Sequence, residues 1–468
     1  MNDFCLLLFE EVNKKKDGLI KDFMENHNNE IIPFWEYFDS SKNSILSKTI
    51  FNEMYNDFDY LCNYLETNLK NKNEIKNYIN TPNNQGYTPL HYASFKGKIS
   101  IISRLIKLDA DTSIKNEKGL TVLHIAAQGN QPNSLAYFKE KCNENLNRYD
   151  NAQSTPLHWA CYTGGVKAVD YLLCNDVELD QIDNQKVTAL HLAVLSDNIK
   201  IIKKLLRAGA DTNIKDSNNR TPEELAVLKK KKCAKIFRKK KRRCCNCIVI
   251  KTPNRKIKRS KKNIYLFLFL YIFSITTEIL FVIDNFEKKY LYIFIVLNFI
   301  VFLIYFSLIC KSTKIHQAQI NILKLLEEGK DINDYCTKCK IKKENHTVHC
   351  FICQQCIEDF DHHCYWINKC VGKKNYCLFI SFLFYNLINF SYYIYIDFHT
   401  FFKKNKKHKT LSLIFSIINL CIIIFFALLI FLLIFINLRN AIYNKKLKKQ
   451  EKKFIDTSCS NKLIDSEA

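Results

Sequence analysis

The chain has 468 residues and a formal net charge of +24, and 47% of its residues are hydrophobic. A chain of this length has room for two or three domains of roughly 150 residues each. A high positive charge often indicates nucleic-acid binding. Here, however, eighteen Lys and Arg residues lie in residues 229–262, directly before the first long apolar segment, where anionic lipid headgroups would meet them. We therefore expect a membrane protein with no nucleic-acid partner.

The 20 cysteines are concentrated in one part of the chain, with eight of them between Cys336 and Cys377. The apolar run from Cys5 to Phe9 is too short for a secretory signal peptide, so we expect no cleaved signal. Cytosolic thiols stay reduced, which argues against a disulfide framework. The dense cysteines therefore indicate metal binding or thiol chemistry.

Most of the first 228 residues belong to a repeat. Residues 1–82 carry apolar positions at helical spacing but no motif, and we expect a helical N-terminal region or a degenerate repeat there. From residue 83 to 228, a threonine recurs at the start of similar segments. The threonines are Thr88, Thr121, Thr155, Thr188 and Thr221. Their spacing of 33 or 34 residues is typical of a stacked array of helix pairs.

Each threonine is expected to cap a helix, because proline follows it in three copies, as at Thr88 and Pro89. Leu90 and Ala93 then lie three apart on one buried stripe. A second helix follows in each copy, such as the one from Ile201 to Gly209, whose glycine suits a left-handed C-cap. The repeated histidines are expected to hydrogen-bond within and between repeats rather than bind metal. They are His91, His124, His158 and His191.

This segment resembles the ankyrin repeat family, whose T-P-L-H-x-A signature is complete at residues 88–93 and 155–160. The resemblance covers residues 83–228 and implies a solenoid that binds partner proteins. In the fifth copy, Glu223 and Glu224 replace the expected Leu and His. That departure suits a degenerate terminal repeat with a polar outer face.

Four apolar segments are long enough to cross a bilayer, which takes about 20 residues per helix. They are Ile264–Ile283, Tyr290–Ile309, Cys377–Tyr395 and Leu411–Ile436. An even number of spans and the basic run before the first span place both termini in the cytosol. The segment between the second and third spans is then cytosolic too. Three cysteines of the basic run are either lipidated beside the membrane or reduced thiols, namely Cys244, Cys245 and Cys247.

The expected fold is mainly α, with a helical solenoid, a four-helix transmembrane domain and a cytosolic zinc-binding, cysteine-rich domain. The expected parts are the N-terminal region 1–82, repeats 83–228, basic linker 229–263, spans 264–310, cysteine-rich domain 311–376, spans 377–437 and cytosolic tail 438–468.

The cysteine-rich segment has the ligand spacing of two zinc sites. Residues 336–370 contain seven Cys and four His, and the C-x2-C pairs place two sulfurs on one metal. The histidines are His346, His349, His362 and His363. Two tetrahedral sites need eight ligands, so six Cys and two His would leave one Cys unbound.

The unbound cysteine is a candidate nucleophile. If residues 362–364 are extended, His362 and Cys364 lie on one face of the strand and His363 lies on the other. His363 can then bind zinc, while His362 acts as a base that favours the reactive Cys364 thiolate and Asp361 orients the imidazole. Alternatively, Cys364 is itself a zinc ligand and the module is purely structural. Spacing alone leaves both alternatives open.

The motif C-x2-C-x9-HC-x2-C-x2-C-x4-DHHC-x5-C-x4-N-x3-F runs from Cys336 to Phe379 and resembles the DHHC protein S-acyltransferase family. Four spans with this domain in the middle, preceded by ankyrin repeats, resemble its ankyrin-bearing branch. The resemblance implies one zinc ion on Cys336, Cys339, His349 and Cys356. It implies a second zinc ion on Cys350, Cys353, His363 and Cys370. Cys364 would then be the acyl-accepting nucleophile, with His362 as base and Asp361 as its partner.

The activity implied by the resemblance is protein palmitoylation. Cys364 would attack the thioester of a fatty acyl-CoA, and the acyl group would pass to a cysteine of a protein substrate near the membrane, recruited by the ankyrin repeats. A Golgi or endoplasmic reticulum membrane is also implied. The alternatives are a non-catalytic, zinc-stabilised scaffold and an ankyrin-bearing channel, for which no pore-lining segment is found.

The sequence departs from the family pattern at three places. Tyr365 stands where the family usually has Pro, D-P-G is missing from residues 311–335, and T-T-x-E is absent from residues 437–445. These departures bear on the efficiency of catalysis more than on the fold.

Overall fold

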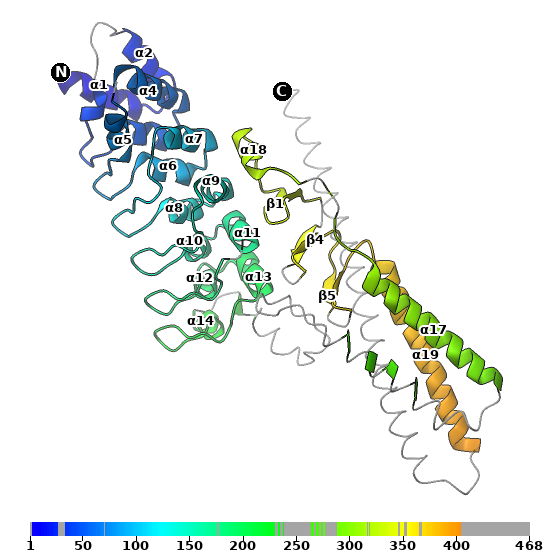
Figure 1. Cartoon of the computed structure of the whole chain (residues 1–468). Helices are drawn as coiled ribbons and strands as arrows, with labels where there is room; N and C mark the ends of the chain where they lie inside the picture. The colour runs from blue at the N-terminus through cyan, green and yellow to red at the C-terminus, as the bar shows by residue number, and fades with distance from the viewer. Residues whose placement is uncertain are drawn as a thin grey trace, which may run out of the picture. The chain divides into compact units, whose positions relative to one another are not determined.

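A computed structural model provides the structure of the chain (Figure 1). It describes residues 2–26, 33–69, 71–175, 177–229, parts of 233–276, 288–315, 317, 319–344, 347–350, 353–364 and 367–403. The described chain is mainly helical, as expected. It divides into two compact units, which are considered separately. The first unit is Met1–Cys244, Lys251–Ile257 and His316–Cys356, and the second is Cys245–Ile250, Lys258–Ile315 and Ile357–Ala468.

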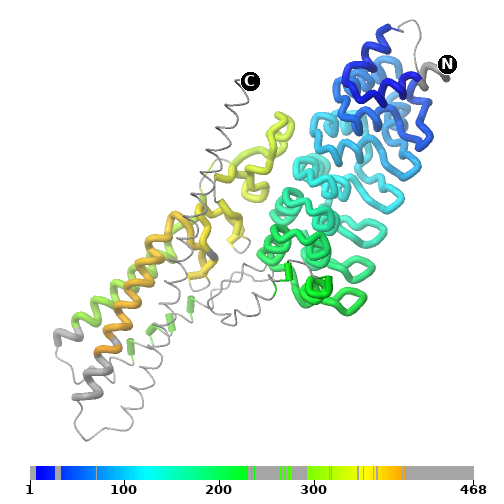
Figure 2. The backbone as a smooth tube through the Cα atoms, turned by 180° about the vertical axis from the view of Figure 1, so that it is seen from behind, coloured from blue at the N-terminus to red at the C-terminus, as the bar shows by residue number. Residues whose placement is uncertain are grey.

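The first unit contains a stack of helix pairs, which both views show with its connecting loops leaving on one side (Figures 1 and 2). It begins with α1 (Asn2–Asn13), α2 (Leu19–Asn26), the 3-10 helix η1 (Phe34–Glu36), α3 (Ile45–Phe51), α4 (Tyr55–Asn68) and α5 (Lys72–Asn80). The first helices of the later pairs are α6 (Pro89–Lys96), α8 (Val122–Gln128), α10 (Pro156–Thr163), α12 (Ala189–Leu195) and α14 (Pro222–Leu228). The second helices are α7 (Ile99–Lys107), α9 (Pro132–Cys142), α11 (Val166–Cys174) and α13 (Ile199–Ala208).

Each first helix of these later pairs begins directly after its repeated threonine, as predicted. The backbone N–H of Thr88 donates to Nδ1 of His91 at 3.1 Å, so the proton of the neutral ring is on Nε2. That Nε2–H donates to the carbonyl of Leu120 in the next repeat at 3.3 Å. The same bridge recurs at His124, His158 and His191. The histidines therefore join one repeat to the next, which confirms their predicted role.

A second recurring feature of the stack is a tight turn that begins five residues before each capping threonine. Asn83 Oδ1 accepts hydrogen bonds from the N–H groups two and four residues further on, at 3.0 and 2.8 Å. Asn116, Asp150, Asp183 and Asp216 make the same turn. Successive turns pack closely, because Gly86 has φ +82° and a Cβ there would lie 2.6 Å from Cα of Asn116.

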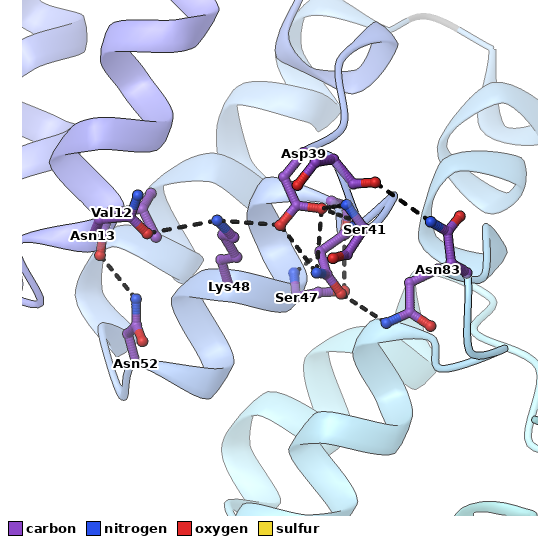
Figure 3. Close-up of polar contacts among 12 residues, drawn as sticks. Val12, Asn13, Asp39, Ser41, Ser47, Lys48, Asn52 and Asn83 are labelled. Carbon is purple, nitrogen blue, oxygen red and sulfur yellow. Dashed lines mark hydrogen bonds and ion pairs between the residues drawn. The ribbon is translucent and has the colours of Figure 1, made fainter.

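The pair α3–α4 is a further, degenerate copy of the repeat. Asp39 makes the recurring turn, accepting from the N–H groups of Ser41 at 2.9 Å and Asn43 at 2.7 Å (Figure 3). Five residues after Asp39, Ser44 caps α3 in place of threonine. The segment S-I-L-S at residues 44–47 thus replaces T-P-L-H, and helix α3 packs against α6 as the later first helices pack against one another.

The apolar core of the first unit is continuous along the stack. The residues predicted to line the buried stripe, such as Leu90 and Ala93, are at most 1% exposed. Gly209 ends α13 with φ +96°, as predicted for a left-handed C-cap. Because each pair buries its apolar side chains against its neighbours, the repeats stabilise one another.

The second unit contains the long helices α17 (Lys288–Cys310) and α19 (Tyr376–Lys403). Within α17, Tyr292–Cys310 is long and apolar enough to cross a membrane, with a mean hydropathy of 2.8. Within α19, the apolar stretch Tyr376–Tyr392 is shorter. The first predicted span is described only in part, and the fourth, Leu411–Ile436, lies outside the described residues. One candidate span is therefore found in the described chain, and the four-span domain remains a prediction.

A polar contact joins the two long helices of the second unit within their apolar stretches. Asn389 of α19 donates from Nδ2 to Oδ1 of Asn298 of α17 at 3.0 Å. The hydroxyl of Tyr271 donates to the backbone carbonyl of Asn298 at 2.8 Å. Both asparagines are buried, so the hydrogen bond is shielded from water.

The cysteine-rich segment consists of short hairpins. Its strands are β1 (Tyr335–Cys336), β2 (Ile341–Lys342), β3 (Val348–Cys350), β4 (Gln355–Ile357), β5 (His362–Cys364) and β6 (Lys369–Val371). They form three two-stranded sheets, β1–β2, β3–β4 and β5–β6. One short helix, α18 (Ile322–Glu327), precedes them and belongs to the first unit.

Candidate metal centres and thiol site

The first Cys/His cluster is formed by Cys336, Cys339, His349 and Cys356, and its four ligand atoms lie within 4.8 Å of one another. Cys336 ends β1, and Cys339 lies in the turn before β2, where its N–H donates to the Cys336 sulfur at 3.4 Å. His349 lies in β3 and Cys356 in β4. Two hairpins therefore supply one set of four ligands.

The spacing within the first cluster fits a zinc ion. Tetrahedral zinc with Zn–S bonds of about 2.3 Å and Zn–N bonds of about 2.0 Å places sulfur and nitrogen about 3.5 Å apart. Nδ1 of His349 lies 3.5 Å from Sγ of Cys336, 3.2 Å from Sγ of Cys339 and 3.8 Å from Sγ of Cys356. Three sulfurs and one nitrogen are also a common donor set for structural zinc.

One thiol from the repeats touches the first cluster. Hydrogen bonds from the thiols of Cys174, Cys339 and Cys356 hold the pKa of Cys336 below its ordinary range. Cys174 ends α11 of the stack, and the sequence did not identify it as a neighbour of the cluster.

The second Cys/His cluster is formed by Cys350, Cys353, His363 and Cys370, whose ligand atoms also lie within 4.8 Å of one another. The N–H of Cys353 donates to the Cys350 sulfur at 3.5 Å, as in the first C-x2-C pair. Nδ1 of His363 lies 3.7 Å from Sγ of Cys370, close to the separation expected on zinc. The donor set is again three Cys and one His, so this cluster could hold a zinc ion as well.

The β5–β6 hairpin carries the expected nucleophile. His363 pairs with Cys370, and Cys364 pairs with Lys369. Successive residues of a strand point to opposite faces, so Cys364 faces away from His363. Among the described residues, Cys364 belongs to neither Cys/His cluster.

The surroundings of Cys364 are apolar. Its side chain is 7% exposed and belongs to a cluster of buried residues from α17, the hairpin and α19. The other buried members are Val301, Tyr305, Leu308, Ile367, Val371, Phe379, Phe382 and Leu383. The thiol is therefore beside an apolar surface that continues into the candidate span.

The other two expected catalytic residues are only partly described. The N–H of Asp361 donates to the carbonyl of Val371 at 3.0 Å, which extends the hairpin by one bond. The backbone of His362 pairs with Val371, and its side chain lies outside the described part of the structure. His346, the histidine with no assigned role, and Tyr365 also lie outside the described residues.

Asn375 links the hairpin to α19. Its Oδ1 accepts from the N–H of Gly372 at 3.0 Å, and its Nδ2 donates to the carbonyl of Cys370 at 3.0 Å. The side chain is 1% exposed. The motif contained this asparagine at a fixed spacing, but only the structure shows that it holds the strand after Cys364 against the start of α19.

Fold and site together define an ankyrin-type solenoid joined to a module with two Cys/His clusters and one cysteine apart from them. Residues 329–453 match the family described as DHHC palmitoyltransferase. Three overlapping matches to ankyrin repeats cover residues 53–150, 95–183 and 123–216. The chain therefore contains a DHHC palmitoyltransferase domain and ankyrin repeats.

Curated relatives bear palmitoyltransferase names. Palmitoyltransferase ZDHHC17 from Rattus norvegicus is 39% identical over 88 residues, which are 19% of this chain and 14% of that protein. Probable protein S-acyltransferase 12 from Arabidopsis thaliana is 36% identical over 105 residues, or 22% and 36% of the two chains. Palmitoyltransferase ZDHHC13 from Pongo abelii is 26% identical over 361 residues, or 64% and 58%. The chain thus spans less than two thirds of each of these relatives.

Proposed function

We propose that this protein is a protein S-acyltransferase that moves a fatty acyl group, such as palmitate, from acyl-CoA to protein cysteines through a thioester on Cys364. The observation that carries the proposal is a buried thiol that belongs to neither Cys/His cluster and lies against an apolar surface. The DHHC palmitoyltransferase match, which includes this thiol, supports it.

The proposed reaction has two steps. In the first, His362 takes the thiol proton of Cys364, and the thiolate attacks the carbonyl carbon of the acyl-CoA thioester. The carbon–sulfur bond to CoA breaks, and the CoA thiolate leaves and is protonated. In the second step, the thiolate of a substrate cysteine attacks the acyl-enzyme, and Cys364 leaves as a thiolate that recovers a proton. Asp361 would orient the imidazole of His362.

The apolar surroundings of Cys364 favour a long acyl chain over a small acyl group. Helix α17 contributes Val301, Tyr305 and Leu308, and α19 contributes Phe379, Phe382 and Leu383 to the buried cluster around the thiol. An acyl chain lying along these helices would remain out of water, and each buried methylene contributes about 0.8 kcal/mol. The thioester carbonyl would then be held at the thiol by the binding of the chain.

Zinc would serve structure rather than chemistry. Each Cys/His cluster is a closed set of four ligands, and a catalytic zinc site keeps one position open for water or substrate. Bound zinc would supply rigid cross-links between the hairpins. The residues of the chain itself carry the acyl group and the protons.

The ankyrin repeats are proposed to recruit protein substrates whose cysteines lie near the membrane. Stacked repeats present an extended surface suited to protein partners, and each contributes its own first helix and turn. We propose a multi-pass protein of the Golgi or endoplasmic reticulum membrane with both termini in the cytosol, which the basic run of residues 229–262 supports.

The test is incorporation of labelled palmitate into the full-length protein incubated with palmitoyl-CoA. The parent is expected to form a hydroxylamine-sensitive label that maps to Cys364, and Cys364→Ser is expected to lose it. Cys377→Ser is the matched control, because Cys377 is an exposed thiol at the start of α19 and lies outside both clusters. Its label should equal that of the parent.

A zinc-stabilised scaffold gives a different result. It would bind two zinc ions and yet show no thioester at Cys364 in the parent. Label that survives in Cys364→Ser and disappears in Cys377→Ser would also refute the proposed nucleophile.

A further inference from the structure

A short segment before the first zinc cluster resembles the second half of an ankyrin repeat. Residues 321–333 read NILKLLEEGKDIN, and residues 201–213, which form the second helix and following turn of a repeat, read IIKKLLRAGADTN. Seven of the thirteen positions are identical. The segment begins 93 residues after the repeats end at residue 228, and it follows the candidate span in the sequence.

The likeness extends to the backbone. Gly209 follows α13 with φ +96°, and Gly329 follows α18 by two residues with φ +72°. The next N–H then returns to a carbonyl five residues earlier in both segments, from Ala210 to Leu205 at 3.0 Å and from Lys330 to Leu325 at 2.9 Å. Asp211 and Asp331 each accept from the N–H two residues later, at 2.9 and 3.1 Å.

This segment is packed against the repeats. Helix α18 contacts the second helices α7 and α9. Four apolar side chains of residues 321–333 are at most 9% exposed and belong to the same core cluster as the repeats. They are Ile322, Leu325, Leu326 and Ile332. The N–H of Ile332 donates to Oδ1 of Asn133 at the start of α9, at 3.2 Å. An extra helix thus joins the row of second helices from the side.

The contact continues into the first Cys/His cluster. Thr337 lies between the ligands Cys336 and Cys339, and its Oγ1 accepts from Nδ2 of Asn175, directly after α11, at 3.1 Å. Lys340 after the second ligand forms an ion pair of 3.9 Å with Glu140 of α9. The Cys174 thiol, at the end of α11, lies near the Cys336 sulfur. Polar and apolar contacts therefore run without interruption from α18 to the ligand loop.

We propose that residues 320–340 are an anchor that fastens the first zinc cluster to the second helices of the ankyrin repeats. The repeats then hold the loop of the first Cys/His cluster directly, and the opposite side of the stack, with its first helices and turns, stays available to partners. Because zinc binding orders the ligand loop and the loop contacts α9 and α11, metal binding and stability of these repeats are linked. The proposal does not depend on the transferase activity.

The test is hydrogen–deuterium exchange of the zinc-loaded, full-length protein, comparing the parent with two variants of α18. Leu326→Asp places a charge on the buried face, and Lys324→Asp places the same charge on the exposed face. We expect Leu326→Asp to exchange about tenfold faster in α9, in α11 and in residues 334–344. Lys324→Asp should match the parent, and α12 to α14 should keep their protection in both variants.

A milder variant distinguishes loss of this contact from general unfolding of Leu326→Asp. Asn133→Ala removes the acceptor of the Ile332 N–H and leaves the apolar contacts in place. If Leu326→Asp exchanges faster everywhere, including residues 189–228, the exchange of Asn133→Ala decides whether the proposed contact exists. It should accelerate exchange at residues 330–340 alone, and unchanged exchange there overturns the proposal.

Removal of zinc tests the linkage independently. A chelator should raise exchange in the parent at residues 334–350 and also in α9 and α11. In Leu326→Asp the chelator should change only the ligand loop, because the repeats have already lost their contact with it. A parent whose α9 and α11 keep full protection after zinc is removed overturns the proposal.

Discussion

The bridging histidines predict that acid destabilises the ankyrin repeats. Burial lowers the pKa of His91 and of His124 from 6.5 to about 4. In the unfolded chain the imidazole takes up a proton below pH 6.5, whereas in the folded repeats it stays neutral down to about pH 4. The stability of the folded repeats is therefore complete above pH 6.5 and falls as the pH drops from 6.5 toward 4. The linkage relation gives a loss of about 2 kcal/mol per histidine between pH 7.5 and 5, or about 4 kcal/mol for the two. Burial also lowers the pKa of His158 and His191, which adds to the loss.

The assay is urea unfolding of the detergent-solubilised protein at several pH values, followed by the fluorescence of Trp159. Phenylalanine would replace Trp35 and Trp366, which leaves Trp159 of α10 as the reporter. His91→Gln and His124→Gln should each unfold more easily at pH 7.5, but each should remove about 2 kcal/mol of the loss on acidification. A parent with equal unfolding free energy at pH 7.5 and 5, or a double variant that keeps the full loss, would refute the reasoning.

Three further predictions concern the turns, the hairpin and the metals. Gly86→Ala should lower the unfolding free energy of the repeats by about 1–3 kcal/mol, because φ is positive and Cβ would overlap the backbone of Asn116; an unchanged urea midpoint would contradict it. Asn375→Ala should slow thioester formation by about tenfold or more with both zinc ions retained, since two buried hydrogen bonds to the hairpin are lost; wild-type kinetics would show that the hairpin needs no such support. Cys336→Ser should reduce the zinc content from two ions to one, measured by mass spectrometry, while Cys364→Ser should keep both; equal zinc loss in the two variants would place Cys364 among the ligands.

Local chemistry was sufficient to predict much of the repeat. Thr88, Pro89 and His91 lie within four residues. The helix cap, the first helical turn and the bridging histidine therefore follow from the spacing of these residues and from the hydrogen-bonding groups of their side chains. The sequence left residues 1–82 as either a helical region or a degenerate repeat, because Ser44 and Ser47 replace the threonine and histidine of the signature. The turn at Asp39 is what identifies that copy, and an isolated Asp carries too little information to be found in a sequence.

For the site, the sequence predicted the metal ligands but not the surface that the ligand loop contacts. The C-x2-C pairs predict two metal clusters, and the structure groups the eight expected ligands as two sets of four. Ligand spacing cannot predict which surface a loop touches, so the contact of Thr337 with Asn175 was not foreseen. The sequence match between residues 321–333 and residues 201–213 predicts helix α18, but the T-P-L-H-x-A signature belongs to the first helices of the repeats and does not include it.

The asparagine pair between α17 and α19 fixes how far one helix can slide along the other. A shift of one helical turn would displace α19 by about 5.4 Å and separate Asn389 from Asn298, leaving two amides without each other in an apolar setting. Asn375 ties the thiol-bearing hairpin to the start of the same helix. A pair of amides buried among apolar residues therefore fixes the position of the Cys364 hairpin along α17.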